Sequence, residues 1–206
     1  MSSQAPTDPP ASFTAFVGQR LVASGPLEAV LPEVRAILAK DEGTLMIFAD
    51  ETGDTIEPDF RLADADIVAR FSPPAEAQPV DKKVGRPKLG VVAREVTLLP
   101  RHWDWLASQP EGASAALRKL VEQARRDSVG ADRVRRSQRS VDRFIYRMAG
   151  DLPLFEEAYR AFYAKDLITL DRLIANWPAD VRDHLRRLVA SFARNLALEN
   201  HAISNA

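Results

Sequence analysis

The side chains that could perform acid–base or metal chemistry are few in this sequence. The 206 residues include no cysteine and three histidines, His102, His184 and His201. No two histidines have the close spacing of a metal-binding helix motif, and no glycine-rich phosphate loop or nucleophile elbow is present. We expect His102 on a helix surface, His184 on a helix whose apolar face lies elsewhere, and His201 near a frayed terminus. The sequence therefore predicts no catalytic residue, no metal site, no cofactor and no enzyme.

Acidic residues cluster at three places and could in principle bind a cation. The clusters are Asp41-Glu42, Asp50-Glu51 and the pair Asp64 and Asp66. Each falls where a turn is expected, and aspartate is favoured in turns because its side chain bonds to the local backbone. Their spacing is not that of a calcium-binding EF-hand loop. We therefore expect these carboxylates to stabilise turns and not to hold a metal.

Positive charge is concentrated in the middle of the chain, where it favours contact with phosphate. Residues 1–80 contain 5 Lys or Arg and 13 Asp or Glu, whereas residues 81–147 contain 16 and 8. Arginines on a helix neutralise DNA phosphates and make binding dependent on salt. Either the middle segment binds a nucleic acid, or its basic face is a solvated helix surface or docks on the acidic N-terminal part of the same chain. The crowded arginines are Arg125, Arg126, Arg133, Arg135, Arg136, Arg139, Arg143 and Arg147.

Residues 12–71 have the pattern of a small α+β domain with the order ββαββ. Two β-rich runs flank Gly18-Gln19, which predicts a hairpin. A second hairpin is indicated by the turn residues Glu51–Asp54 between two further apolar runs. A tail over residues 1–11 is expected to be neither folded nor a signal peptide. Between the hairpins, apolar residues at helical spacing predict a helix. These residues are Leu27, Val30, Leu31 and Val34.

The rest of the chain divides into a linker, a middle segment and a helical bundle. Residues 72–90 contain four prolines and two glycines, which disfavour both helix and central strand. In residues 91–126, a strand-like run ends at Pro100, a short helix follows, and Ser114 is expected to cap a second helix after a proline–glycine break. Residues 131–200 carry four apolar helical stripes and predict the bundle. The expected fold class is α+β.

The middle segment resembles a known DNA-binding module. The stretch REVTLLPRHWDWLASQPEGASAALRKLVEQARR is similar to ribbon-helix-helix proteins of the CopG/Arc type in its order of strand, short helix, glycine break and second helix. In that family, two chains pair their strands into a ribbon that enters the major groove, and the second helix meets phosphate through its N-terminus. The resemblance implies an obligate homodimer and places Gly112, Ala113 and Ser114 at the DNA backbone.

Basic residues beside the module are further candidates for DNA contact. The sequence Val84-Gly85-Arg86-Pro87-Lys88 resembles half of an AT-hook, in which an extended arginine lies in a narrow minor groove. Within the strand, Thr97 faces the groove in one register and Arg94 in the other, and neither register gives a row of base-reading side chains. The candidate DNA-binding residues are Arg86, Lys88, Arg94, Thr97, Gly112, Ala113, Ser114, Arg118, Arg125 and Arg126.

The whole chain also resembles an uncharacterised bacterial family, domain of unknown function twenty-two thirty-nine. The stretches GRPKLGVVAREVTLLPRHWDWL and ASAALRKLVEQARR carry this resemblance, which extends over residues 12–200. The family has no established activity, so the resemblance implies a bacterial origin and a domain order but supplies no function.

Two functions remain open from the sequence. The first is a homodimeric DNA-binding protein, such as a transcriptional regulator or an antitoxin-like autorepressor, that binds mainly through phosphate and minor-groove contacts. The second is a non-catalytic structural or interaction protein that uses the ribbon only to dimerise, which the aliphatic run Val96-Thr97-Leu98-Leu99 favours. No apolar run approaches the roughly 20 residues needed to span a bilayer, so we expect a cytoplasmic protein with no membrane partner. The partner of the acidic N-terminal domain is not indicated.

Overall fold

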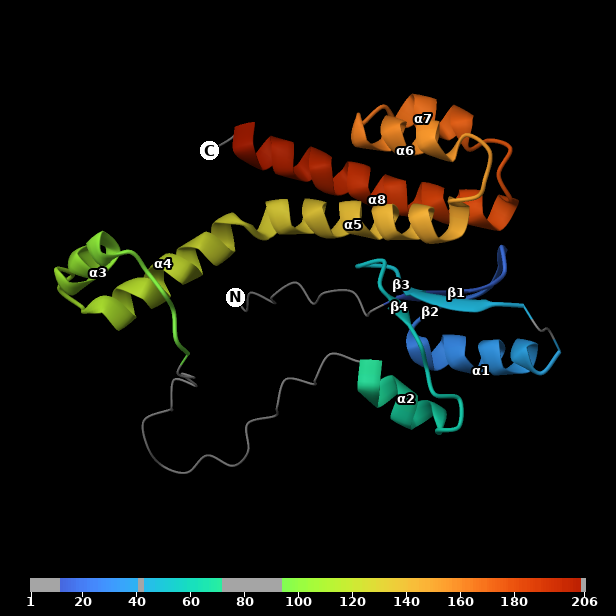
Figure 1. The fold of residues 1–206 in the computed structure, drawn as a ribbon, viewed down its shortest axis with the longest axis horizontal. Coiled ribbons are helices and arrows are strands. Elements are labelled where there is room, and N and C mark those ends of the chain that lie inside the picture. The colour runs from blue at the N-terminus through green and yellow to red at the C-terminus, as the bar shows by residue number, and fades with distance from the viewer. Residues whose placement is uncertain (1–11, 41–42, 72–93, 205–206) are drawn as a thin grey trace, which may run out of the picture. The chain divides into compact units, whose positions relative to one another are not determined.

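The computed structural model describes residues 12–40, 43–71 and 94–204 (Figure 1). The described residues form an α+β structure with four strands and eight helices. They divide into two compact units, the first containing the described residues up to 71 together with 131–204, and the second containing 94–130. The tail over 1–11 and the linker over 72–90 lie outside the described residues.

The sheet of the first unit consists of two antiparallel hairpins. β1 (Phe13–Val17) pairs with β2 (Arg20–Gly25), and β3 (Leu45–Ala49) pairs with β4 (Thr55–Ile56). Gly18 turns the first hairpin with a φ of 57°, a conformation that glycine adopts without a steric penalty. Because β1 also pairs antiparallel with β3, the strand order is β2-β1-β3-β4. The predicted ββαββ order is confirmed.

One face of the sheet is covered by the first two helices. α1 (Leu27–Leu38) buries all four residues of the predicted stripe against the sheet, together with Phe13, Ala15 and Ile47. The stripe residues are Leu27, Val30, Leu31 and Val34.

The helix α2 (Asp64–Phe71) also packs in this layer through the buried Ile67. It was not predicted: Asp64 and Asp66, assigned to turns from the sequence, lie in its first turn. Arg35 of α1 fixes this helix, because its Nε donates to Asp64 Oδ1 at 2.7 Å and its Nη1 and Nη2 donate to main-chain carbonyls at 2.7 and 2.6 Å.

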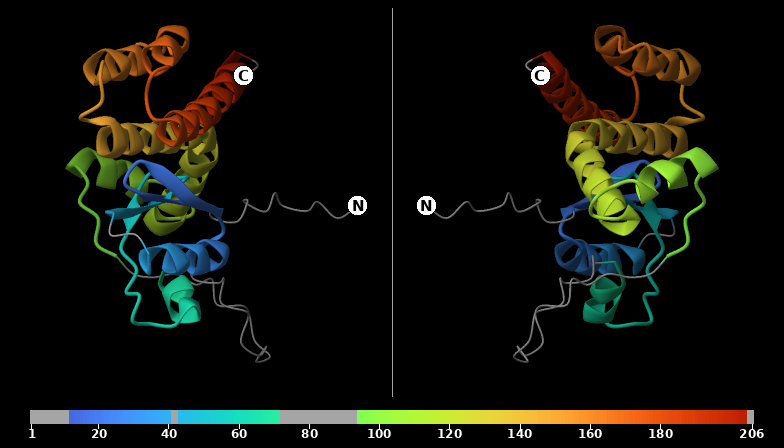
Figure 2. Two further views of the ribbon diagram at one scale, coloured as in Figure 1. Left: turned by 90° about the vertical axis from the view of Figure 1, so that its right-hand side faces the viewer. Right: turned by 90° about the vertical axis from the view of Figure 1, so that its left-hand side faces the viewer.

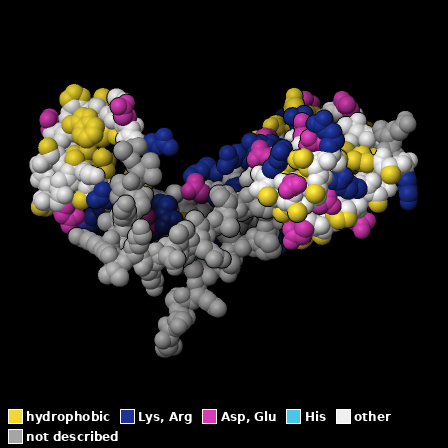
Figure 3. Space-filling view, turned by 90° about the horizontal axis from the view of Figure 1, so that it is seen from below, with side chains coloured by type: hydrophobic (Ala, Val, Ile, Leu, Met, Phe, Trp, Pro, Cys, Tyr) yellow, Lys and Arg dark blue, Asp and Glu magenta, His cyan; other side chains and the backbone are white. Residues whose placement is uncertain are grey.

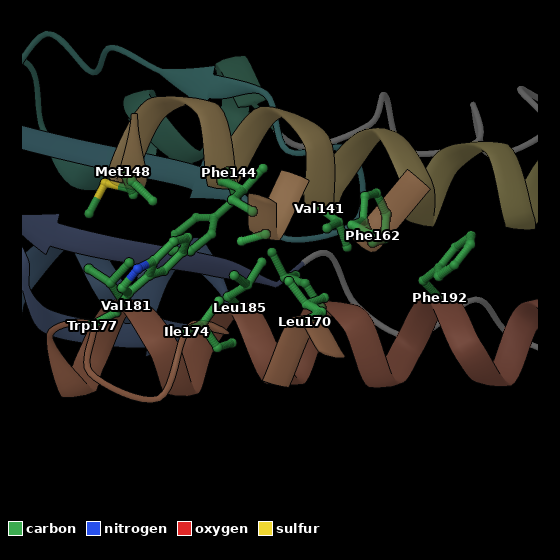
Figure 4. Close-up of a cluster of buried hydrophobic side chains, with 14 of the residues drawn as sticks. Val141, Phe144, Met148, Phe162, Leu170, Ile174, Trp177, Val181, Leu185 and Phe192 are labelled. Carbon is green, nitrogen blue, oxygen red and sulfur yellow. The ribbon is translucent and has the colours of Figure 1, made fainter. Parts of the chain in front are cut away.

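Four helices form the rest of the first unit. They are α5 (Val129–Ala149), α6 (Phe155–Tyr163), α7 (Leu167–Leu173) and α8 (Ala179–Ser204). α5 and α8 lie next to the sheet, and α6 and α7 lie on the side away from it (Figures 1 and 2). Their apolar stripes meet in one core, of which Figure 4 shows the central side chains.

The sheet and the C-terminal helices share this core. Side chains on a strand alternate between faces, so Phe16 and Phe48 point away from α1. Their rings lie 5.6 and 5.2 Å from the ring of Phe144 on α5. The two stretches that the sequence divides into a small domain and a separate bundle therefore bury one continuous set of side chains.

The second unit contains two helices joined by a short break. α3 (Pro100–Ala107) begins with Pro100 in its first turn, as predicted, and α4 (Ala113–Asp127) follows Gly112. Of the strand expected before α3, residues 90–93 lie outside the described residues, and 94–99 form no strand with any described segment. Leu99 is nevertheless extended, with φ −67° and ψ 150°.

Candidate functional site

The candidate residues before α3 are exposed where they are described. Arg86 and Lys88 lie outside the described residues. Arg94 and Thr97 belong to the run 94–99, in which only Leu98 is partly buried. This part of the site therefore has no strand partner among the described residues, and its side chains are largely exposed to solvent.

The N-terminus of α4 differs in detail from the prediction. Gly112, with φ 77°, is the N-cap residue, and no side chain caps the helix. Ser114 is not the cap as expected, because the helix already begins at Ala113; its hydroxyl accepts a hydrogen bond from Arg118 Nη1 at 3.0 Å. Among the described residues, the main-chain amides of this first turn therefore have no side-chain acceptor. Such amides, at the positive end of a helix dipole, bind anions.

The partners that the structure describes for the three basic candidates on α4 are all exposed. Arg125 and Arg126 both pair with Glu122, at 2.9 and 3.2 Å, and Arg118 contacts Ser114. Exposed pairs of this kind are screened by solvent and contribute little to stability, so the guanidinium groups can exchange them for phosphate.

The apolar side chains of the second unit lie largely on its surface. α4 is amphipathic, yet none of its 15 residues is buried, and α3 buries only Leu106. Trp103 and Trp105 are 42% and 51% exposed, so neither is a core residue within one chain. Leu120 and Val121 are 49% and 63% exposed. Figure 3 shows hydrophobic side chains gathered on this unit.

Two arginines of α5 bind the acidic turn between β3 and β4. Arg136 pairs with Glu51, and Arg143 pairs with Asp54 and donates to the carbonyl of Thr52 at 3.1 Å. Both arginines belong to the basic run that could have met phosphate. For these two arginines, the interpretation that the basic run docks on the acidic N-terminal part of the chain is therefore correct.

The turn approaches α5 closely at Gly53. A Cβ on Gly53 would lie 2.8 Å from Ser140 Cα, and Ser140 Oγ donates to the carbonyl of Asp50 at 2.7 Å. Only glycine fits here, since φ is 70° and the helix backbone leaves no room.

A partly buried carboxylate and a buried imidazole face each other beside this turn. Asp50 Oδ1 lies 3.8 Å from His184 Nε2, and neither atom has a hydrogen-bond partner among the described residues. Asp50 Oδ2 accepts from Ser12 at 2.8 Å and from Thr14 at 3.0 Å. On the other side of the ring, Arg187 Nη2 lies 3.0 Å from His184 Nδ1. Because a guanidinium only donates, Nδ1 accepts, and the proton of the neutral ring is on Nε2.

Burial shifts the pKa values of both side chains towards their neutral forms. Burial, together with a smaller effect of the positive charge of Arg187, lowers the pKa of His184 to about 3. The 3.8 Å separation from Asp50 is therefore not an ion pair at neutral pH, because the imidazole is uncharged. Burial raises the pKa of Asp50, against hydrogen bonds from Ser12 and Thr14 and the charge of Arg187, which lower it.

The sequence interpretation of both residues was wrong. His184 is 2% exposed, and its ring lies 4.5 Å from that of Phe144, whereas it was expected to face away from the apolar stripe. Asp50 was expected to form hydrogen bonds within its own turn. Its side chain instead accepts hydrogen bonds from Ser12, which precedes β1, and from Thr14 of β1. A signal for His184 was present, since it follows Val181 by three residues and precedes Leu188 by four, which is the spacing of one helix face.

Within the described parts of the chain, no three His, Asp or Glu side chains come together as metal ligands. No helix there is long and apolar enough to cross a membrane. The cluster Asp41-Glu42 lies outside the described residues.

Comparison with known proteins gives the family. A family model described as an uncharacterized protein conserved in bacteria, DUF2239, matches residues 12–189. The chain belongs to this family. In DUF2239 the matched region runs from the start of the sheet into α8, so it includes both units described above. No curated protein and no solved structure matches the chain.

Proposed function

We propose that this DUF2239 protein is a homodimer that binds DNA through its second unit. The observation that carries the proposal is the exposed apolar face of α4, an amphipathic helix with no buried residue. An amphipathic helix gains most of its stability by burying that face. Two helices with one buried side chain do not make a core, so the unit needs a partner surface.

A second copy of the chain supplies that surface in a self-complementary way. The run 94–99 has main-chain groups without a strand partner, and an identical strand from another chain satisfies them as an antiparallel ribbon. The same association brings together the exposed faces around Trp103, Leu120 and Val121. This arrangement is the one that the ribbon-helix-helix resemblance implies.

The polar side of the unit supports DNA as the ligand. The first turn of α4 presents free amides after Gly112, and three arginines of that helix are bound only by exposed partners. Phosphate oxygens are suited to both kinds of donor. The basic residues Arg86 and Lys88 precede the unit and suit the minor groove. Binding through phosphate and minor-groove contacts fits a strand that offers few base-reading side chains.

A structural role without DNA is the second candidate. It is favoured by the exposed aliphatic side chains of Val96 and Leu99, 58% and 48% exposed, which suit pairing between chains better than contact with base edges.

The first experiment measures the oligomeric state by size exclusion with light scattering. We expect a dimer, and we expect Val121→Asp to convert it to a monomer because a carboxylate would enter the apolar interface. Leu198→Asp is the matched control, since Leu198 is equally exposed at 63% but belongs to the first unit. A monomeric wild-type chain at high concentration would refute the homodimer.

The second experiment titrates duplex DNA at two salt concentrations. Replacing Arg118, Arg125 and Arg126 by alanine should weaken binding and reduce the slope of log K against log salt by about 0.9 for each phosphate that is no longer neutralised. A charge-matched control replaces Arg160, Arg172 and Arg194 of the first unit and should leave the slope unchanged. A dimer with no DNA affinity at low salt would select the structural role.

A further inference from the structure

A hollow between α5 and α6 on the first unit contains none of the residues proposed to contact DNA. Its volume is about 340 Å³. Ligand sites are typically about 300–1,000 Å³, so the hollow is large enough for a small organic molecule. Its lining residues are Arg135, Gln138, Arg139, Asp142 and Tyr163.

The charged groups of the hollow are ordered along α5. Arg135 and Arg139 are one helical turn apart on the same face, and Asp142 follows Arg135 by seven residues. At a rise of 1.5 Å per residue, the charged groups extend over about 10 Å of helix from Arg135 to Asp142, with Arg139 about 4.5 Å from Asp142 along the axis. A nucleoside monophosphate is of similar length, with an anionic group at one end and hydrogen-bond donors along the rest.

The guanidinium groups at the positive end are available to a ligand. Arg139 makes no hydrogen bond or ion pair with any described residue. Within the part of the chain that the structure describes, Arg135 pairs only with Asp132, three residues earlier on an exposed helix surface, an interaction that contributes about 0–1 kcal/mol. Two arginines at this spacing can hold a phosphate through several charge-assisted hydrogen bonds. Gln138 lies between them and also has no partner among the described residues.

The other end combines a fixed carboxylate with an aromatic ring. Asp142 Oδ1 accepts hydrogen bonds from Tyr159 at 2.6 Å and from Tyr163 at 2.7 Å. The hydrogen bond to Asp142 raises the pKa of Tyr159, so the Tyr159 hydroxyl stays protonated near neutral pH and continues to donate to the carboxylate. Asp142 Oδ2 has no described partner and can accept from a hydroxyl or an amino group. The Tyr163 ring is 48% exposed and offers a surface on which a base can stack.

We propose that this hollow binds one nucleotide. Arg135 and Arg139 hold its phosphate, Tyr163 stacks on its base, and Asp142 accepts hydrogen bonds from its sugar or base. A simple inorganic anion fits less well, because it uses only the arginines while Asp142 repels it. The nucleotide is either a free mononucleotide or the phosphorylated end of a single strand, since both present the same groups.

The test is a calorimetric titration of the full-length protein with AMP, adenosine, inorganic phosphate and a 5′-phosphorylated single-stranded oligonucleotide. AMP should bind at least about tenfold more tightly than adenosine or phosphate, because each of these lacks one end of the ligand. Tighter binding of the oligonucleotide than of AMP would identify the end of a strand as the ligand. Tighter binding of AMP would identify a free nucleotide. Absence of binding by both nucleotide ligands at millimolar concentration would overturn the proposal.

Variants assign the binding to this hollow. Arg139→Ala should weaken AMP binding about tenfold, whereas Arg147→Ala, on the same helix but outside the hollow, should not change it. Tyr163→Phe should retain most of the affinity, and Tyr163→Leu should lose it with the stacking surface. Unchanged AMP affinity in Arg139→Ala would place the ligand elsewhere and refute the site. Binding of duplex DNA should be unaffected by Arg139→Ala, so the nucleotide site and the DNA interface are tested separately.

Discussion

Acidification from about pH 7 to about pH 4.5 should destabilise the protein through His184. In the unfolded chain this side chain titrates near its ordinary pKa of 6.5, whereas in the folded protein burial lowers the pKa to about 3. Between these values the unfolded state binds a proton that the folded state does not, so the free energy of unfolding falls as the pH falls. The expected loss is about 2.5 kcal/mol over this interval, or about 1.4 kcal/mol for each pH unit below 6.5.

Asp50 acts in the opposite direction. Its pKa is raised in the folded state, so the folded protein takes up a proton at Asp50 before the unfolded chain does. Protonation then relieves the cost of burying the carboxylate and offsets part of the loss from His184. An Asp50→Asn variant lacks this compensation and should lose stability more steeply on acidification than the wild type.

The assay is urea unfolding at several pH values, followed by circular dichroism. His184→Phe removes the titrating group while keeping a ring next to Phe16 and Phe144, and its pH dependence should be shallower by about 2.5 kcal/mol over the interval. His184→Gln serves as a second variant if the phenylalanine does not fold. His102→Gln, at an exposed position of α3, is the control and should keep the wild-type dependence. Equal pH dependence of the wild type and both His184 variants would refute a buried, neutral imidazole.

The same unfolding assay tests the docking of the turn and the packing of the shared core. Gly53→Ala should cost about 2 kcal/mol or more, because the new methyl group meets the backbone of Ser140 at a positive φ. Gly18→Ala, whose Cβ would meet nothing within 4 Å, should cost only about 1 kcal/mol for its φ of 57°, and equal costs would contradict the close approach. Phe144→Ala should lower the free energy of unfolding by about 3–5 kcal/mol, because it leaves a cavity in the core. Tyr146→Ala should lower it by less than about 1 kcal/mol, because Tyr146 is 68% exposed.

Features that depend on near neighbours in the chain could be predicted from the sequence. The stripe from Leu27 to Val34 defines α1, Gly18 defines a hairpin turn, and Pro100 starts α3, because each signal acts within a few residues. Ser114 was misplaced as a cap because Gly112, at a positive φ, starts α4 before it.

Features that depend on distant neighbours could not be predicted in the same way. His184 looks polar beside Asp183 and two arginines, and its burial depends on Phe16 and Phe144, which are far from it in sequence. The Asp142 hollow likewise depends on tyrosines of another helix. The candidate DNA contacts remain predictions, because their test requires a second chain and a duplex.

The order in which this fold is synthesised separates the two halves of its main core. The sheet leaves the ribosome first, but the described elements that cover the face with Phe16 and Phe48 are α5 and α8, which come after α3 and α4 in the chain. Until those helices are made, the nascent protein exposes an aromatic sheet surface, the kind of surface that recruits chaperones or aggregates. A chain that stops before residue 131 would keep that surface open permanently. Expression of the isolated N-terminal half should therefore yield an insoluble product, whereas removal of the second unit alone leaves both halves of the core in one chain.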